Sequence, residues 1–97
     1  MHARVSSYDL TGATKEDVVA AFDTARLAVE DIPGNQGGML LVDIAQGKAL
    51  TITLWESEQA LRDSEQRANT LRREAAGSAG MSITGVDAYE VALEFGP

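Results

Sequence analysis

The feature that most constrains the fold is a change of periodicity on either side of the single tryptophan, Trp55. Residues 48–55, KALTITLW, alternate, with leucine and isoleucine on one face and Thr51, Thr53 and Trp55 on the other, which predicts a strand. Directly afterwards the small and apolar residues recur at helical steps, which predicts a helix over 57–75. Trp55 is therefore expected at the joint between a strand and a helix.

The predicted second helix has an N-cap, an inward stripe and two charge pairs. Ser57 is a residue type that caps helices well. Oppositely charged residues four positions apart stabilise a helix by a few tenths of a kcal/mol. The pairs are Glu58 with Arg62 and Asp63 with Arg67, and the inward stripe is Leu61, Ser64, Ala68, Leu71 and Ala75.

The same periodicities predict the remaining elements. Thr14 is the expected N-cap of the first helix, and Pro33-Gly34 ends it. Gly47 is expected in a tight turn between two strands. The predicted strands are 3–8, 37–44, 48–55 and 86–95, the predicted helices are 14–32 and 57–75, and residues 77–85 are expected to be a flexible linker rather than a lid.

The element order β-α-β-β-α-β predicts a single α+β domain over residues 1–97 with a ferredoxin-like fold. In this fold a four-stranded antiparallel sheet carries two helices on one face. The run Met39-Leu40-Leu41-Val42 is apolar on both strand faces, and two helices cover only one of them. We therefore expect a homodimer in which a second copy covers the other face.

Composition excludes several classes of partner. A formal charge of −7 leaves no basic patch for nucleic acid. The absence of cysteine excludes disulfides and thiolate metal sites. No apolar run approaches the length of a membrane span or a signal peptide, so we expect no membrane partner and a cytoplasmic location.

The usual catalytic and cofactor motifs are missing. The only histidine, His2, is expected to be a frayed terminal residue, so no Ser-His-Asp or Cys-His set can form. The segment GNQGG fits neither phosphate-binding glycine pattern. The carboxylates do not combine with histidine at a metal-ligand spacing. We expect neither metal nor cofactor, and composition alone identifies no catalytic residue.

Two segments carry a resemblance to a known family. LWESEQALR at 54–62 and IPGNQGGMLL at 32–41 resemble the antibiotic biosynthesis monooxygenases, which are dimeric α/β-barrel proteins. The resemblance implies the same fold and a ligand cleft between the sheet and the second helix. Some members oxidise polycyclic phenols to quinones without a cofactor, and others degrade haem.

The resemblance also implies site residues. Trp55 matches the pocket tryptophan of the cofactor-free oxygenases, and Arg72 matches a later helix arginine. Thr51 stands where those enzymes have asparagine, and Leu61 stands where they have tyrosine. Two polar pocket positions have therefore lost their usual chemistry, which weakens the expectation of polyketide oxygenation.

The haem-degrading branch fits less well. It needs a histidine on the second helix, which has none, and an asparagine on the first strand, where Ser6 and Ser7 stand instead. Alternation places Arg4 and Tyr8 on one strand face, where they are further candidates for the site. An acidic neighbour would explain Arg4 as well as an anionic ligand would.

Two questions stay open at this level. Trp55 is either a core anchor or a pocket wall, and the resemblance favours turning its face of the strand towards the helices. The favoured function is cofactor-free oxygenation of a small electron-rich phenol, with Trp55 stacked on the ring and Arg72 or Arg4 holding the oxyanion. The alternatives are a non-catalytic ligand-binding or dimerisation module and, less favoured, a domain that binds a basic protein.

Overall fold

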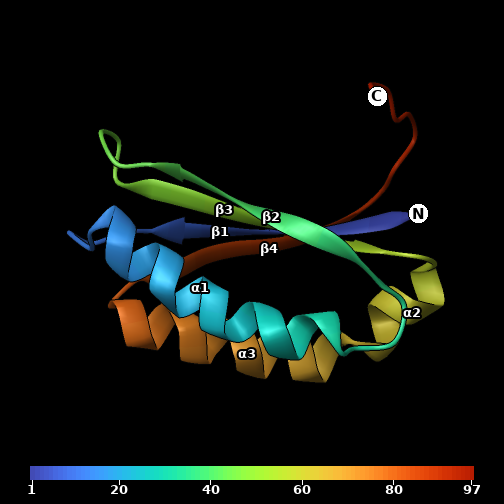
Figure 1. Ribbon diagram of the computed structural model, residues 1–97, viewed down its shortest axis with the longest axis horizontal. Coiled ribbons are helices and arrows are strands. Elements are labelled where there is room, and N and C mark those ends of the chain that lie inside the picture. The colour runs from blue at the N-terminus through green and yellow to red at the C-terminus, as the bar shows by residue number, and fades with distance from the viewer.

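The protein has the predicted α+β ferredoxin-like architecture (Figure 1). A computed structural model describes all residues from Met1 to Pro97. The elements are β1 (His2–Asp9), α1 (Lys15–Glu30), β2 (Asn35–Asp43), β3 (Lys48–Trp55), α2 (Glu58–Asp63), α3 (Glu65–Ala79) and β4 (Ser82–Glu90). No helix is long and apolar enough to cross a membrane.

The four strands form one antiparallel sheet in the order β2-β3-β1-β4. The first strand of the chain is therefore a central strand, with β3 on one side and β4 on the other. All three helices lie on one side of the sheet, and its other side is open (Figure 1). We call these the helix face and the open face.

The helix α1 begins and ends as its sequence predicts. The Thr14 side chain accepts a hydrogen bond from the Asp17 backbone N–H, so the N-terminus is capped. Val18, one turn further on, is fully buried against Tyr8 and Ala49 of the sheet. This cluster forms the core at one end of the molecule and fixes α1 over the sheet.

The predicted second helix is divided in two at Ser64. The Ser64 hydroxyl donates to the Leu61 carbonyl at 2.7 Å, a local bond by which serine competes with regular helix geometry. The Glu58–Arg62 ion pair forms as predicted. The predicted pair between Asp63 and Arg67 is wrong, because the break falls between these residues and no ion pair joins them.

The prediction of a linker at 77–85 is also wrong. α3 continues to Ala79 and ends at Gly80, whose φ of +73° is a left-handed conformation suited to glycine. The Met81 N–H then bonds to the Ala76 carbonyl at 2.8 Å and turns the chain directly into β4. This segment is therefore neither a lid nor a flexible connection.

The last strand ends five residues before its predicted end at residue 95. β4 pairs with β1 only as far as Glu90, which lies opposite His2, and one further bond joins the Val91 N–H to the Met1 carbonyl. Beyond that point β1 offers no more backbone to pair with. His2 is likewise not frayed, since it begins β1 and its Nδ1 is buried without a partner.

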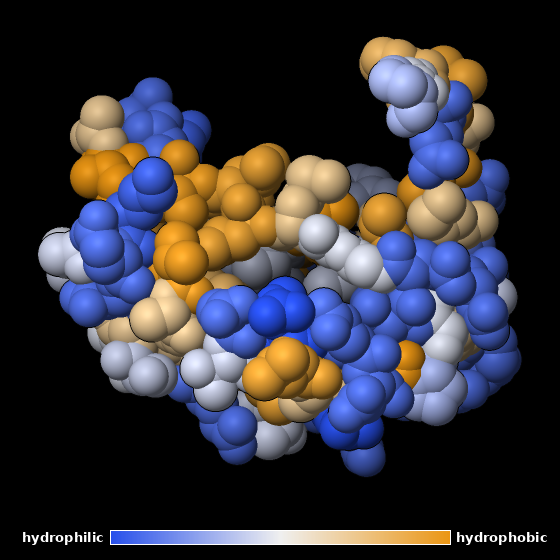
Figure 2. Space-filling view, viewed as in Figure 1, coloured by the Kyte–Doolittle hydropathy of each residue, from blue (hydrophilic) through white to orange (hydrophobic).

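The two faces of the sheet differ in composition. Trp55 and Ala49 of β3 are buried on the helix face, which confirms the orientation implied by the resemblance. The alternate residues Leu50, Ile52 and Leu54 consequently point to the open face. Figure 2 shows hydrophobic side chains gathered over β2 and β3 on the side away from the helices, where Met39 is 54% exposed.

Candidate functional site

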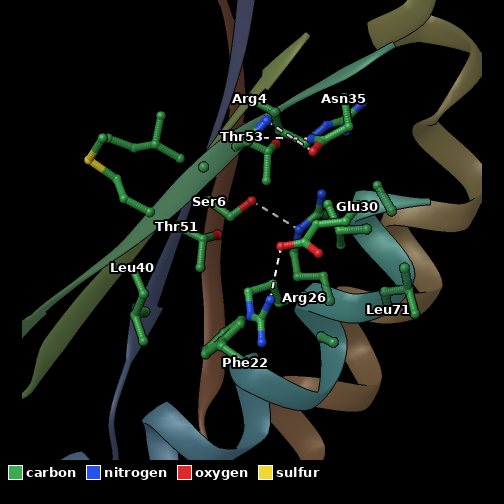
Figure 3. Close-up of a pocket in the computed structure, with 18 of the residues that line it drawn as sticks. Arg4, Ser6, Phe22, Arg26, Glu30, Asn35, Leu40, Thr51, Thr53 and Leu71 are labelled. Atoms are coloured by element: carbon green, nitrogen blue, oxygen red, sulfur yellow. Dashed lines mark hydrogen bonds and ion pairs between the residues drawn. The ribbon is translucent and has the colours of Figure 1, made fainter. Parts of the chain in front are cut away.

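A cavity of about 300 Å³ lies between the helix face of the sheet and the helices (Figure 3). Its helical wall comes mainly from α1, through residues such as Phe22 and Val29. α3 supplies the remainder through Ala68, Leu71 and Arg72. The resemblance implies a cleft beside the second helix. The cavity does reach this helix, through α3, although most of its helical residues belong to the first helix.

The floor of the cavity is polar. Arg4 and Ser6 of β1 lie opposite Thr53 and Thr51 of β3, and directly opposed residues in an antiparallel pair share a face. These four side chains, together with Tyr8, line the cavity from below. The structure thus brings together Arg4, Tyr8, Thr51, Trp55 and Arg72, all of which the sequence indicated as site residues.

Arg72 enters the cavity from α3 and is 9% exposed. Its Nε donates to the Ser6 hydroxyl at 3.0 Å, and its Nη1 donates to Asn69 Oδ1 at 2.6 Å. Its Nη2 makes no hydrogen bond within the chain. The guanidinium is therefore held in a fixed orientation with donors to spare.

Arg4 is buried from the opposite side, by α2 and the start of α3. It donates to the Ser64 hydroxyl at 3.1 Å and to the Leu61 carbonyl at 2.8 Å, so the helix break supplies both acceptors. Its guanidinium lies 5.6 Å from the centre of the Trp55 ring, within range of a cation–π contact. Burial, and then the charge of Arg72, lower the pKa of Arg4, while Glu65 opposes that shift.

Neither of these two arginines has a carboxylate partner. The three ion pairs of the protein join Arg26 to Asp23, Arg26 to Glu30 and Arg62 to Glu58. The acidic neighbour considered as an explanation for Arg4 is therefore not present at ion-pair distance. A chain with a net charge of −7 has two buried cations beside an internal cavity.

Tyr8 and Thr51 form a hydroxyl pair at the other end of the floor. Their oxygens are 3.1 Å apart, and Tyr8 is only 2% exposed. The Tyr8 ring also packs edge-on against Phe22 of α1, with 5.2 Å between ring centres. Leu40 and Phe22 are neighbouring side chains at this end, and Arg26 lies beside Phe22 (Figure 3).

Trp55 combines the two roles that its position suggests. It is fully buried in a cluster with Ile32 and Leu61, which makes it a core anchor. It also borders the cavity, and its Nε1 donates to the Thr53 hydroxyl at 3.0 Å. Leu61 packs in this cluster without bordering the cavity.

Several lining residues were not indicated by the sequence. Asn35 borders the cavity from the start of β2, where its Nδ2 donates to the Leu54 carbonyl and its Oδ1 accepts from the Gly37 N–H. Its place directly after Pro33-Gly34 was a signal, since asparagine there is suited to a turn. Arg26 and Glu30 border the cavity from α1 and carry helix-surface spacing, which gave no hint of a site.

The cavity contains no histidine and no unpaired carboxylate. Its two carboxylates, Asp23 and Glu30, both pair with Arg26, at 2.9 and 3.0 Å. No group of three or more His, Cys, Asp or Glu side chains is placed to hold a metal ion. What the site offers is cationic hydrogen-bond donors, hydroxyls and apolar surface.

Comparison with known proteins shows which solved structures share this fold. The sequence matches no protein-family model and no curated protein. Its structure is similar to SnoaB, a cofactor-independent oxygenase from Streptomyces nogalater, with a TM-score of 0.73 and 14% identity over 96% of this chain and 94% of that one. A "putative antibiotic biosynthesis monooxygenase" from Bordetella bronchiseptica gives 0.72 and 18% over 95% and 97%.

The haem-degrading protein MhuD from Mycobacterium tuberculosis has the same fold, with a TM-score of 0.66 and 22% identity over 99% of this chain and 100% of that one. The fold of this chain is therefore the monooxygenase-like fold of the antibiotic biosynthesis monooxygenases. The resemblance found in the sequence is confirmed at the level of the fold.

Proposed function

We propose that this protein binds a small aromatic anion in the cavity and oxygenates it without a cofactor. The observation that carries the proposal is the pair of buried arginines, Arg4 and Arg72, which border the cavity without a carboxylate partner. Buried charges are normally paired, because an unpaired one costs several kcal/mol. An anionic ligand would supply the missing partner.

Two cations favour the ionised form of a phenol. A phenol such as the tyrosine side chain has a pKa of about 10 in water, and a nearby positive charge favours its anion. Arg72 offers its free Nη2 to that oxygen, and Arg4 adds a second positive charge. The proton leaves to solvent, so this binding mode requires no general base within the cavity.

An ionised electron-rich ring can reduce O₂ directly. In the proposed reaction a ring C–H becomes C=O, one oxygen atom enters the ring and the other leaves as water, so phenol and O₂ give quinone and water. The protein binds the ring against Trp55 and Phe22, holds the oxyanion and excludes water. The cavity volume of about 300 Å³ is at the lower end for small-molecule sites, which suits a small fused-ring compound.

The similarity to SnoaB supports this reaction class, since that protein is a cofactor-independent oxygenase. MhuD is a haem degrader, but α2 and α3 of the present chain contain no histidine to bind a haem iron. Oxygenation of a phenol is for this reason the better-supported of the two activities.

A non-catalytic ligand-binding module is the second candidate. It is favoured by the ion pairs of Arg26, which occupy both carboxylates at the cavity and leave no group free to abstract a proton from carbon. The two candidates share the same ligand chemistry. They differ only in whether O₂ is consumed.

We also propose that the protein is a homodimer in which the open faces of two sheets pack together. Leu41 and Tyr89 on this face are 44% and 55% exposed, although hydrophobic side chains of this size are usually buried. In the tail that follows β4, Leu93 and Phe95 are 80% and 91% exposed and alternate as in a strand. A second copy would bury both the face and the tails.

The test uses 1-naphthol as the phenol and 1-methoxynaphthalene as a neutral analogue that cannot ionise. Binding is measured without oxygen, through the fluorescence of the single tryptophan, and O₂ uptake is measured afterwards. We expect 1-naphthol to bind more tightly as the pH rises towards its pKa, and the analogue to show no such dependence. Binding with O₂ uptake supports the oxygenase, binding without uptake supports the second candidate, and no binding contradicts both.

A further inference from the structure

The Tyr8–Thr51 hydroxyl pair has no role in the reaction outlined above. The two hydroxyls carry two protons, and their mutual hydrogen bond uses one of them. Neither oxygen has any other hydrogen-bond partner in the chain. One O–H donor is therefore left over beside the cavity, which both residues line.

A leftover donor is costly once a bound ligand has displaced the water around it. Phe22 and Leu40 border the same end of the cavity, and neither side chain can accept a hydrogen bond. A buried donor without an acceptor loses the hydrogen bond that it had with water. A ligand oxygen placed against the pair would restore this bond, whereas an apolar ligand atom would not.

The hydroxyl pair lies close to Arg72 on the floor of the cavity. Thr51 lies directly opposite Ser6 in the β1–β3 ladder, and directly opposed side chains have Cβ atoms about 5 Å apart. Ser6 in turn holds the Nε of Arg72 at 3.0 Å. The cation and the hydroxyl pair are thus neighbours on the cavity floor, with Ser6 between them.

We propose that Tyr8 and Thr51 form a second recognition point, which selects phenols that carry a second oxygen substituent in addition to the ionised one. This inference rests on the proposed function, because it assumes that Arg72 holds the ionised oxygen. It narrows the substrate class from small phenols in general to phenols with a second oxygen substituent. Tyr8 and Thr51 then determine specificity and orientation, and they hold the ring in one of its two possible directions.

The experiment compares two ligands of nearly equal shape, 4-methoxy-1-naphthol and 4-ethyl-1-naphthol. The methoxy oxygen accepts a hydrogen bond, and the CH₂ group that replaces it does not. Affinities are measured without oxygen through tryptophan fluorescence. We expect the wild-type protein to prefer the methoxy compound by about two- to tenfold, the contribution of one ordinary hydrogen bond.

The double variant Tyr8→Phe/Thr51→Val removes both hydroxyls and keeps the side-chain shapes, so it is expected to bind the two compounds equally. Its control is Thr24→Val/Thr70→Val, which removes two hydroxyls from exposed positions of α1 and α3 and is expected to keep the wild-type preference. A purely structural role of Tyr8 and Thr51 would weaken both ligands alike and leave their ratio unchanged.

The outcomes separate this inference from the proposed function. Equal binding of both naphthols by the wild type, or a preference that survives in the double variant, overturns the second recognition point and leaves the arginine site standing. If neither naphthol binds the wild type, the proposed function fails and this inference fails with it.

Discussion

The two faces of the sheet have their polarity reversed relative to an ordinary α+β domain. The face under the helices carries Arg4, Ser6 and Thr51, while the face without cover carries Leu50 and Ile52. In a sheet with one solvated face, the covered side is normally apolar and the solvated side polar. Here the covered side carries much of the polarity, and the side open to water is apolar over the middle of β2 and β3.

This reversal shows what each face is for. Polar groups under a helix layer cost free energy unless a ligand or a neighbouring group satisfies them, which points to a binding site. An apolar face open to water points to a protein partner. Each assignment predicts how particular substitutions change dimerisation, stability or ligand binding.

The largest effect is expected at the open face. Leu50→Lys would place an uncompensated charge in the proposed dimer interface, at a cost of about 3–5 kcal/mol for each of the two copies. We expect sedimentation to show a dimer for the wild type and a monomer for the variant. Thr70→Lys, on the exposed surface of α3, is the control and should remain dimeric. A wild type that is monomeric at micromolar concentration would contradict the interface.

The next effect is expected where the helix face is packed most tightly. Trp55 is fully buried, so Trp55→Ala should lower the free energy of unfolding by about 3–5 kcal/mol. Trp55→Phe keeps an aromatic ring and should lose much less. Denaturant unfolding measures both. A loss below 1 kcal/mol for the alanine variant would show that the tryptophan is not a core anchor.

A smaller effect separates charge from packing at the cavity. Arg72→Met should weaken binding of the 1-naphthol anion by about ten- to hundredfold, because a hydrogen bond to a charged group contributes about 1.5–3 kcal/mol. Binding of neutral 1-methoxynaphthalene should change less than threefold. The control is Arg73→Met, at the exposed neighbouring position. Equal weakening of both ligands would mean that Arg72 only shapes the cavity.

The smallest effect is the most informative about the helix face. Replacing a buried charge by an apolar residue of similar size is often neutral or stabilising, since the desolvation cost disappears with the charge. Arg4→Met should therefore change the free energy of unfolding by less than about 1 kcal/mol while it weakens anion binding. A loss above 3 kcal/mol would assign Arg4 to the scaffold instead of the site.

The sequence predicts the elements well where local signals act alone. The strand 48–55, the Thr14 cap and the turn at Gly47 all follow from periodicity or residue type, and the structure confirms them. The prediction of a strand to residue 95 is wrong for a non-local reason. The alternation is present there, but the partner strand has ended, and only the pairing register with β1 shows this.

The residues of the site likewise fall into those that the sequence predicts and those that depend on tertiary packing. Alternation places Arg4 and Tyr8 on one face, and the resemblance adds Thr51, Trp55 and Arg72. The burial of Leu61 behind Trp55 and the entry of Phe22 from α1 depend on how the helices lie across the sheet. Single-residue patterns carry no information on that packing. The sequence therefore does not show that α1 supplies most of the helical wall of the cavity.

The central position of β1 has a consequence for the time at which this protein becomes functional. The bonds from Arg4 to Ser64 and from Arg72 to Ser6 join residues 60 and 66 positions apart, and β1 also needs β4 as a neighbour. During synthesis the strand that carries the cavity floor leaves the ribosome first, yet its last partner arrives several seconds later. Contacts of such long range form slowly, because the chain must close large loops before they become favourable. The cavity is thus among the last parts of the fold to assemble, because its wall is incomplete until α3 has brought in Arg72.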